Sequence, residues 1–292
     1  MHNSSGFINS STTPGIVRAT AISLLPRFPQ AVQQELVTRA LQDPDPLVRR
    51  AGLGLLFVLP EDRRWILGFP LLSDPVRTLR LEAVSVLADL SLGRNMPPAE
   101  RGSFDHAVEE YRAAQALNAD RPDSWLNIGV LETRLGNISQ AEAAYQRAIH
   151  LQPDFTPSYV NLADVYRAQQ READAERVLR EAIARQPDAP VVHHALGLLL
   201  IRRNRHADAV SELSKAAALS PEMPRYTFIY ALVLDRIGQR AEAIATLENA
   251  QRRFSGDRDI LVALVDLSTQ AGDQRGAHHW GQKLQALGLN PR

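Results

Sequence analysis

The chain has 292 residues, of which 45% are hydrophobic and 23% are charged, proportions that are normal for a globular protein. Its 33 basic and 33 acidic residues give a formal net charge of zero, which argues against a broad nucleic-acid-binding surface, since such a surface needs excess cations. The absence of cysteine excludes disulfides, thiolate zinc sites, thiol nucleophiles and covalently attached c-type haem within this chain. No apolar run approaches the roughly 20 residues that span a bilayer, so membrane insertion is not expected.

The first segment, residues 1–12, is rich in Ser, Asn, Thr and Gly and is expected to be disordered. It lacks the charged and apolar regions of a secretory signal. The compartment therefore stays open: cytoplasmic by default, periplasmic if the chain is a fragment of an exported protein.

A repeat of 31 residues occupies residues 13–92. It is marked by Val-Arg or Leu-Arg pairs, by small residues four positions after the Val or Leu, and by leucines eight positions after it. These are Val17-Arg18, Val48-Arg49 and Leu79-Arg80; Ala21, Gly52 and Ala83; and Leu25, Leu56 and Leu87. Each predicted helix follows a proline turn, where Asp or Ser accepts free backbone N–H groups and proline costs no hydrogen bond. Residues 31–42 and 60–72 are predicted to form the partner helices, the second ending near Pro70.

The arginines Arg18, Arg49 and Arg80 form a ladder with this period. They are expected to pair with Asp residues of neighbouring repeats and so fix the stacking, and a direct functional role is the less favoured alternative. The segment DPDPLVRRAGLGLL (43–56) resembles HEAT repeats, and this resemblance extends over about residues 13–90.

Residues 93–121 are predicted to be a junction that is packed rather than free. Pro97-Pro98 interrupts the 31-residue period, and a helix over 104–118 follows. Its Ala107, Tyr111 and Ala114 precede residues of the same types by 34 positions. We therefore expect an adaptor helix that begins a second array.

A repeat of 34 residues fills residues 122–292, and a fixed period of this length indicates stacked helical hairpins. The five predicted units are 122–155, 156–189, 190–223, 224–257 and 258–291. Small residues are expected where the paired helices cross: Gly129, Ala163, Gly197 and Ala231 on the first helix, and Ala141, Ala175, Ala209, Ala243 and Ala277 on the second.

Turn residues and prolines punctuate each unit. Positive φ is expected in the turn at Gly136, Asn204, Gly238 and Gly272, with Gln170 as the exception in residue type. Prolines at 153, 187 and 221 are expected to end the second helix, and Ser255 replaces proline in the fourth unit. In the last unit Gly281 stands where a large residue is expected, so this degenerate unit is predicted to be a cap.

These motifs resemble the tetratricopeptide repeat family over about residues 104–291. The predicted fold class is accordingly all-α: an α-α superhelical solenoid of HEAT-like and then tetratricopeptide helical hairpins. The order of the two repeat types also resembles the C-terminal part of bacterial multihaem cytochrome c proteins.

The tetratricopeptide resemblance implies a concave face, lined by the first helix of each unit, that binds a peptide or helical segment of a protein partner. The groove positions that it implies are Asn127, Val130, Arg134, Asn161, Asp164, Arg167, His194, Leu198, Arg202, Phe228, Leu232 and Arg236. No nucleic-acid partner is expected, and the oligomeric state is left open.

Three features of this face have two interpretations each. Asn127 and Asn161 would grip a peptide backbone, or asparagine is simply common at that position. The apolar positions from 198 to 232 would bind a partner or pack inside a tightly wound superhelix. The arginines at the ends of first helices are expected to complement helix dipoles rather than clamp a partner carboxylate.

Nothing in the sequence predicts an enzyme, a cofactor or a metal site. The adjacent pairs His193-His194 and His278-His279 point apart on a helix, and no HExxH pattern is present. Glu109-Glu110 is expected to be a solvated helix face. The preferred function is a non-enzymatic scaffold for protein–protein interaction. The alternative is a docking or assembly module of an exported multihaem cytochrome c-type protein, with no haem bound in this chain.

Overall fold

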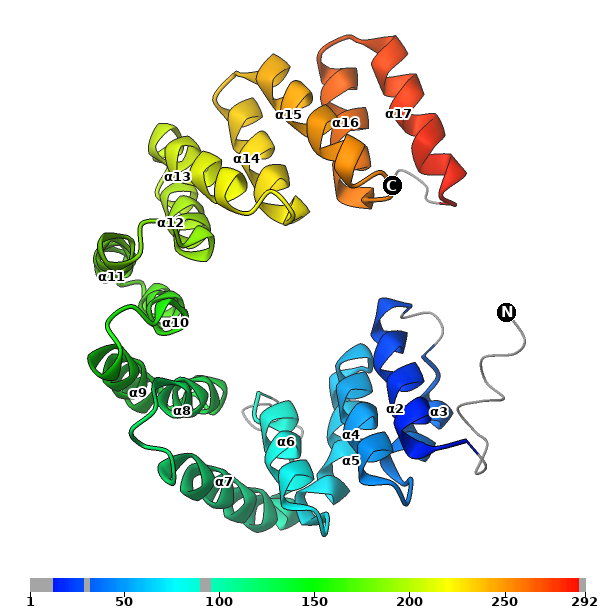
Figure 1. Ribbon diagram of the computed structural model, residues 1–292, viewed down its shortest axis with the longest axis vertical. Coiled ribbons are helices and arrows are strands. Elements are labelled where there is room, and N and C mark those ends of the chain that lie inside the picture. The colour runs from blue at the N-terminus through cyan, green and yellow to red at the C-terminus, as the bar shows by residue number, and fades with distance from the viewer. Residues whose placement is uncertain (1–12, 29–31, 90–95, 289–292) are drawn as a thin grey trace. The chain divides into compact units, whose positions relative to one another are not determined.

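The computed structural model describes residues 13–28, 32–89 and 96–288, and every regular element in these ranges is a helix (Figure 1). This confirms the predicted all-α fold. The expected disordered segment 1–12 lies outside the described residues. No helix in the described ranges is both long and apolar enough to cross a membrane.

The chain divides into two compact units, residues 1–147 (unit 1) and residues 148–292 (unit 2), with the division inside helix α9. This division follows the density of contacts and not the type of repeat. The boundaries predicted from the repeats, with a junction over 93–121, therefore stay a prediction.

Unit 1 consists of short helices connected by proline-containing turns. Its α-helices are α2 (Gly15–Leu24), α3 (Gln34–Leu41), α4 (Pro46–Leu55), α5 (Glu61–Gly68), α6 (Arg77–Leu87), α7 (Arg101–Ala116), α8 (Pro122–Arg134) and the first part of α9 (Ile138–Leu151). Short 3-10 helices occupy Leu25–Arg27, Leu56–Val58, Phe69–Ser73 and Pro98–Glu100.

The local sequence explains where these helices begin and end. Helix α4 has Pro46 in its first turn, and the Asp45 side chain accepts a hydrogen bond from the Leu47 N–H at 2.9 Å. The partner helices α3 and α5 are shorter than the predicted 31–42 and 60–72. Helix α5 ends at Gly68 because Pro70 cannot donate the next helical hydrogen bond, and a 3-10 helix continues to Ser73.

The predicted arginine ladder is present in unit 1. Arg18 pairs with Asp43, and Arg49 pairs with Asp74 at 2.7 Å. Arg49 also donates to the carbonyls of Asp43 and Pro44, so one guanidinium joins its own turn to the next one. This confirms the stacking role that the sequence favoured.

The third member of the ladder pairs with a different residue type. Arg80 donates to Glu110 on α7 at 2.5 Å, where the sequence predicted an Asp partner. Glu110 is therefore part of the ladder, and the prediction that Glu109-Glu110 forms a solvated face is wrong for Glu110, whose side chain is 22% exposed. Arg80 holds the pKa of Glu110 below its usual value through this hydrogen bond.

The described part of the predicted junction is packed. Trp65 on α5 donates its indole N–H to Glu100 at 2.5 Å and lies 5.5 Å from the Phe104 ring between centroids. Phe104, Ala107, Val108 and Tyr111 on α7 belong to the same buried cluster as the helices before it. Helix α7 thus extends the core of the N-terminal repeats, as an adaptor helix should.

Unit 2 consists of antiparallel hairpins of 13- and 14-residue helices (Figure 1). After the end of α9 come α10 (Thr156–Ala168), α11 (Glu172–Arg185), α12 (Pro190–Arg202), α13 (His206–Leu219), α14 (Pro224–Arg236), α15 (Arg240–Arg253), α16 (Arg258–Gln270) and α17 (Gln274–Ala286). Helices α9, α11 and α13 end two residues before Pro153, Pro187 and Pro221, as predicted.

Close approach between helices depends on the predicted small residues. A Cβ on Gly197 would lie 2.5 Å from the Leu213 Cγ, so only glycine lets α12 approach α13 here. Ala175, Ala209 and Ala243 on the facing helices are each at most 1% exposed. The period of 34 thus places small residues where paired backbones cross.

Every turn within a repeat adopts positive φ, including the one without glycine or asparagine. Gln170 has φ of 62° and Asn204 has φ of 58°. Glutamine has no side chain suited to this region, so the repeat geometry imposes the conformation on it.

Candidate functional site

Two concave pockets lie on one face of unit 2, where the first helices of successive hairpins are neighbours. The first pocket has a volume of about 340 Å³ and the second a volume of about 250 Å³. The first pocket is lined by Val160, Ala163, Asp164, Ala175, Leu179, Val191, His194, Ala195, Leu198, Leu199, Arg202, Met223, Arg225 and Tyr226. The second is lined by Phe228, Leu232, Asp235, Asp259, Val262, Ala263, Asp266, Leu267 and Gln270.

Helical periodicity explains why these side chains share a face. His194, Leu198 and Arg202 are four residues apart on α12 and therefore form one stripe. Phe228 and Leu232 form the equivalent stripe on α14. Alanines at 163, 195 and 263 leave space between the stripes, so the surface is hollowed where the helices meet.

The structure brings six of the predicted groove residues in unit 2 into these pockets. Asp164, His194, Leu198 and Arg202 line the first pocket, and Phe228 and Leu232 line the second. Three others lie outside both linings: Asn161, Arg167 and Arg236. Arg167 instead pairs with Asp164 at 3.2 Å, and Arg236 donates to His206 at 3.1 Å.

The predicted residues of unit 1 form no comparable pocket of their own. Asn127 is exposed and donates to Gln115 at 3.2 Å, and Val130 is half-buried. Arg134 donates to the Ser85 carbonyl of α6. The asparagine row therefore has no structural support as a peptide grip at Asn127.

The predicted position of the four arginines at helix ends is confirmed. Arg134, Arg167, Arg202 and Arg236 each lie in the last turn of a first helix. A cation there complements the negative end of the helix dipole.

His194 is the most perturbed group of the first pocket. Its side chain is buried beside Tyr226, with ring centroids 4.6 Å apart. Burial lowers the pKa of His194 to about 4, with a further contribution from the nearby Arg225. The imidazole is therefore neutral at physiological pH, and the positive charge around the pocket comes from arginines.

His193 on the same helix points into the structure and has a different role. Its Nδ1 lies 2.6 Å from a Glu212 oxygen, and its Nε2 lies 2.7 Å from the Pro187 carbonyl. The ring thus joins α12 to α13 and to the preceding proline turn. The two adjacent histidines point apart, as expected from their spacing on a helix.

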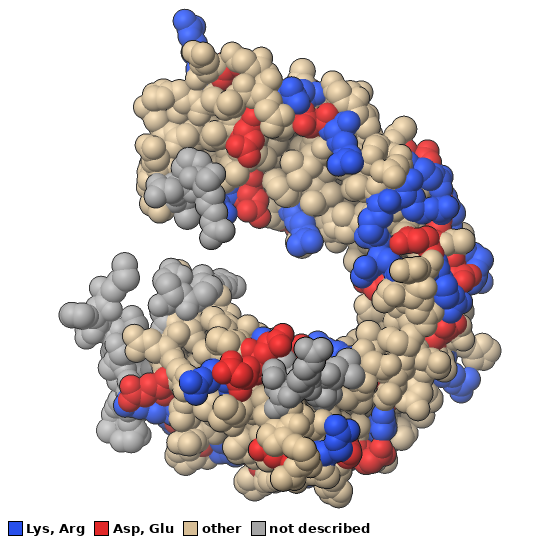
Figure 2. All heavy atoms as spheres, turned by 180° about the vertical axis from the view of Figure 1, so that it is seen from behind, with Lys and Arg blue, Asp and Glu red and all other residues tan. Residues whose placement is uncertain are grey.

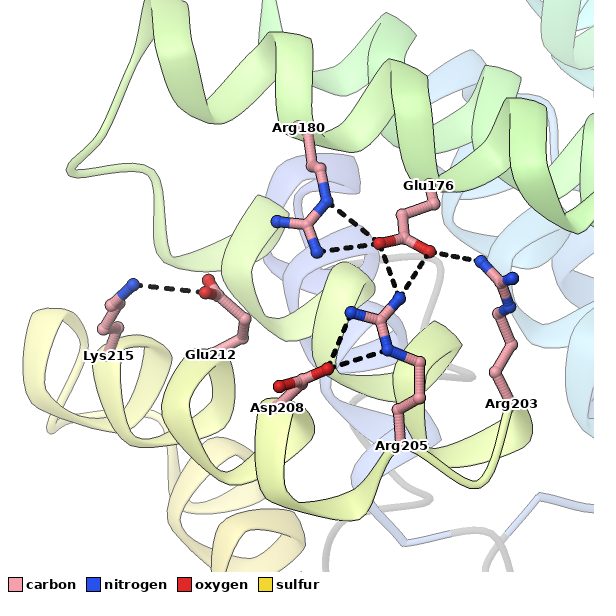
Figure 3. Close-up of polar contacts among 7 residues, drawn as sticks. All are labelled: Glu176, Arg180, Arg203, Arg205, Asp208, Glu212 and Lys215. Atoms are coloured by element: carbon pink, nitrogen blue, oxygen red, sulfur yellow. Dashed lines mark hydrogen bonds and ion pairs between the residues drawn. The ribbon is translucent and has the colours of Figure 1, made fainter.

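A charged network lies at the edge of the hairpins (Figure 3). The Glu176 carboxylate accepts hydrogen bonds from Arg180 at 2.7 Å, from Arg205 at 2.9 Å and from Arg203. Burial acts to raise the pKa of Glu176, but hydrogen bonds from Arg180 and Arg205 outweigh it and leave the pKa lowered. Because the arginines come from α11 and from the turn before α13, this network fastens two successive repeats together.

Acidic and basic side chains are mixed on the surface. On the face drawn in Figure 2, Lys and Arg intermingle with Asp and Glu. This matches the zero net charge of the chain and explains why composition alone gives no sign of a local imbalance.

Sequence reasoning missed part of each pocket wall. Val191, Met223, Arg225 and Tyr226 line the first pocket, and Asp259 lines the second. All five lie at or next to the beginning of a first helix, whereas the predicted positions lie further along. A search one turn toward each helix start would have found them.

Unit 1 contains a further concave surface that the sequence did not predict. Its volume is about 720 Å³, and it is formed mainly by α2, α4 and α6. Exposed Ile16, Leu47 and Phe57 border it, and small residues such as Ala51 and Gly54 form part of its floor. Within the described ranges, no group of three or more His, Asp or Glu side chains could hold a metal ion.

Comparisons with known proteins identify the repeats. Two family models described as tetratricopeptide repeat match residues 134–199, and residues 99–159 and 194–258, respectively. Among solved structures, yeast Tom70 aligns with a TM-score of 0.57 at 18% identity, over 96% of this chain and 62% of that one. PilW, a widely conserved type IV pilus biogenesis factor, aligns with a TM-score of 0.51 at 17% identity, over 73% of this chain and 94% of that one. At such identities the likeness shows the fold alone. A search of curated proteins finds no match.

Proposed function

Because this chain belongs to the tetratricopeptide repeat family, whose fold is a scaffold for protein interactions, we propose that it binds a protein partner without acting as an enzyme. The partner segment is a peptide or helix that lies along the first helices of unit 2. The observation that carries this proposal is the pair of neighbouring pockets, to which four predicted groove residues contribute in the first and two in the second.

The chemistry of the pockets supports a peptide more than a small molecule. Leu198, Phe228 and Leu232 supply apolar surface, and the alanine positions leave room for partner side chains. Leu232 is 39% exposed, although apolar side chains of this size are usually buried. Two adjacent, open, partly apolar hollows suit a segment that places one side chain in each.

A matched pair of leucines tests this proposal. Random 12-residue peptides would be selected by display against the full chain, and the pooled binders would then be measured on two variants. Leu232→Glu changes the second pocket, and Leu219→Glu changes a leucine of equal exposure, 39%, at the end of α13. We expect a loss of affinity of about tenfold or more for Leu232→Glu and less than about twofold for Leu219→Glu. Failure to select any binder, or equal losses in both variants, would contradict the proposal.

We also propose that the 31-residue repeats before α7 are HEAT-like and stack the α7 adaptor onto the array. The ladder of Arg18, Arg49 and Arg80 supports this, because each arginine joins one proline turn to an acid 25 or 30 residues later.

The second candidate function rests on the order of the two repeat types. In that case the chain is the docking or assembly module of an exported multihaem cytochrome c-type protein and binds no haem itself. The absence of cysteine agrees with a haem-free module but is equally compatible with the first proposal. Reading the coding sequence upstream of Met1 tests it: CxxCH motifs and a signal peptide are expected there, and an upstream stop codon without them would exclude it.

A further inference from the structure

The two pockets of unit 2 have opposite charge. Arg202 and Arg225 line the first pocket, and neither forms an ion pair with any described residue. Asp259 and Asp266 line the second pocket and are likewise without an ion-pair partner among the residues that the structure describes. No Lys or Arg lines the second pocket.

The remaining charged groups of the two pockets do not cancel this difference. Asp164 in the first pocket pairs with Arg167 at 3.2 Å, and Asp235 in the second pairs with Arg240 at 2.6 Å. Each of these acids is thus balanced by its own arginine. The nearest carboxylates that act on Arg202 from a distance are Glu172 and Asp164. The excess is positive at the first pocket and negative at the second.

The unpaired charges occupy equivalent places on successive first helices. Arg225 lies in the first turn of α14 and Asp259 in the first turn of α16, while Arg202 and Asp266 lie further along α12 and α16. A segment that crosses these helices therefore passes from cations to anions whichever edge of the face it follows. Since His194 is neutral at physiological pH, the positive end depends on the two arginines.

We propose that unit 2 binds a peptide segment with a fixed polarity, in which acidic residues next to an apolar anchor meet Arg202 and Arg225, and a basic residue meets Asp259 and Asp266. This inference rests on the proposed function and names the chemistry of its partner. The apolar anchor enters the first pocket between Leu198 and the His194–Tyr226 pair. The order of charges then sets the direction and register of the segment, which apolar hollows alone would leave undetermined.

The spacing within the segment follows from helix packing. Neighbouring packed helices lie roughly 10 Å apart, and an extended chain advances about 3.3 Å per residue. The positive and negative sites lie one or two first helices apart, so the acidic and basic residues of the partner are separated by about three to six residues. Binding should weaken as salt is added, because the paired groups are exposed at the rim.

The test uses the same display selection on the full chain and on charge-reversed variants. On the natural chain we expect enriched peptides to carry Asp or Glu beside a large apolar residue, with Lys or Arg about three to six positions away. In the variant Arg202→Glu with Arg225→Glu, the preference for acids should become a preference for bases at that position. In Asp259→Lys with Asp266→Lys, the preference for a base should become a preference for an acid.

The control reverses two arginines on a second helix, Arg252→Glu with Arg253→Glu, and should leave the selected sequences unchanged. Thermal unfolding of each variant shows whether it remains folded. Enriched peptides that depend on Leu232 but show no charge order, or whose charge order survives both reversals, would overturn this inference and leave the proposed function standing. No enriched peptides at all would overturn both.

Discussion

The N-terminal repeats of unit 1 and the hairpins of unit 2 hold their helices together in different ways. In unit 1 a buried arginine connects each proline turn to the acid of the next repeat, as Arg49 does with Asp74. In unit 2 the paired helices touch through glycine and alanine, as Gly197 does with Leu213, and arginine networks lie at the hairpin edge. One repeat therefore depends on a few polar contacts of high individual cost, and the other depends on shape along the whole helix pair.

The difference explains why the two arrays have different tolerances in their sequences. A ladder of ion pairs needs one arginine and one acid per repeat and leaves helix lengths free, so α3 and α5 are short and end in 3-10 turns. Contact through small residues requires the same spacing every time, so the hairpins of unit 2 have helices of 13 and 14 residues. The comparison leads to four predictions.

The largest effect is expected from removing a ladder arginine. Arg49→Leu leaves Asp74, whose side chain is 5% exposed, without its cation, and should lower the free energy of unfolding by about 3 kcal/mol. Arg39→Leu breaks an exposed pair with Glu35, whose side chains are 59% and 72% exposed, and should cost less than about 0.5 kcal/mol. Urea unfolding followed by circular dichroism measures both. Equal small losses would show that the ladder does not stabilise unit 1.

The next effect is expected at a crossing of helices in unit 2. Gly197→Ala places a Cβ 2.5 Å from the Leu213 Cγ and should destabilise the protein by about 2 kcal/mol through overpacking. Gly281→Ala is the control, because a Cβ there meets no atom within 4 Å and alanine favours helix α17 by about 0.5–1 kcal/mol. The unfolding midpoints of the two variants should move in opposite directions. A stable Gly197→Ala protein would contradict the argument from close approach.

A smaller, pH-dependent effect is expected at the last step of the ladder. The pKa of Glu110 is lowered in the folded state by Arg80, so its contribution is present above the unfolded carboxyl pKa and is lost as pH falls through the folded one. Glu110→Gln should therefore be less stable than the natural chain at pH 7, and the gap should close at acidic pH. The exposed neighbour Glu109 supplies the control Glu109→Gln. A gap that stays constant with pH would show that the charge of Glu110 is not involved.

The smallest effect concerns the hairpin turns of unit 2. Gln170 has φ of 62°, a conformation that costs roughly 1–2 kcal/mol for most residues but not for glycine. After the entropy that glycine loses on folding, Gln170→Gly should raise the free energy of unfolding by about 0.5 kcal/mol. Asn204→Gly should gain less, because asparagine tolerates this region. Differential scanning calorimetry would detect the shift, and a lower melting temperature for Gln170→Gly would contradict it.

The sequence predicted most of the fold but only part of the candidate site. Repeat period, small residues and proline turns are local signals, and they placed the helices, the ladder and the helix ends correctly. The site needed to know which turns of neighbouring helices lie side by side. Arg225 and Asp259 were missed for this reason, and Asn127 and Asn161 were favoured by analogy although neither lines a pocket.

Glu110 shows the same limit in unit 1. From sequence it was one of two acids on a helix, and only the packing of α7 on α6 turned it toward Arg80. The nearest Asp by repeat spacing is absent because the junction interrupts the 31-residue period. A residue that substitutes across such a break is found by position in space and not by register.

The sequence by itself determined that this protein is all-helical, that its hairpins recur every 34 residues and that an arginine ladder joins its N-terminal turns. These follow from periodicity, because a helix repeats its faces every 3.6 residues and a stacked repeat must bury the same positions each time. The tertiary structure alone decided where the surface is hollow and which charges remain unpaired. Those properties depend on the distances between side chains of different repeats, and no local pattern in the chain specifies them.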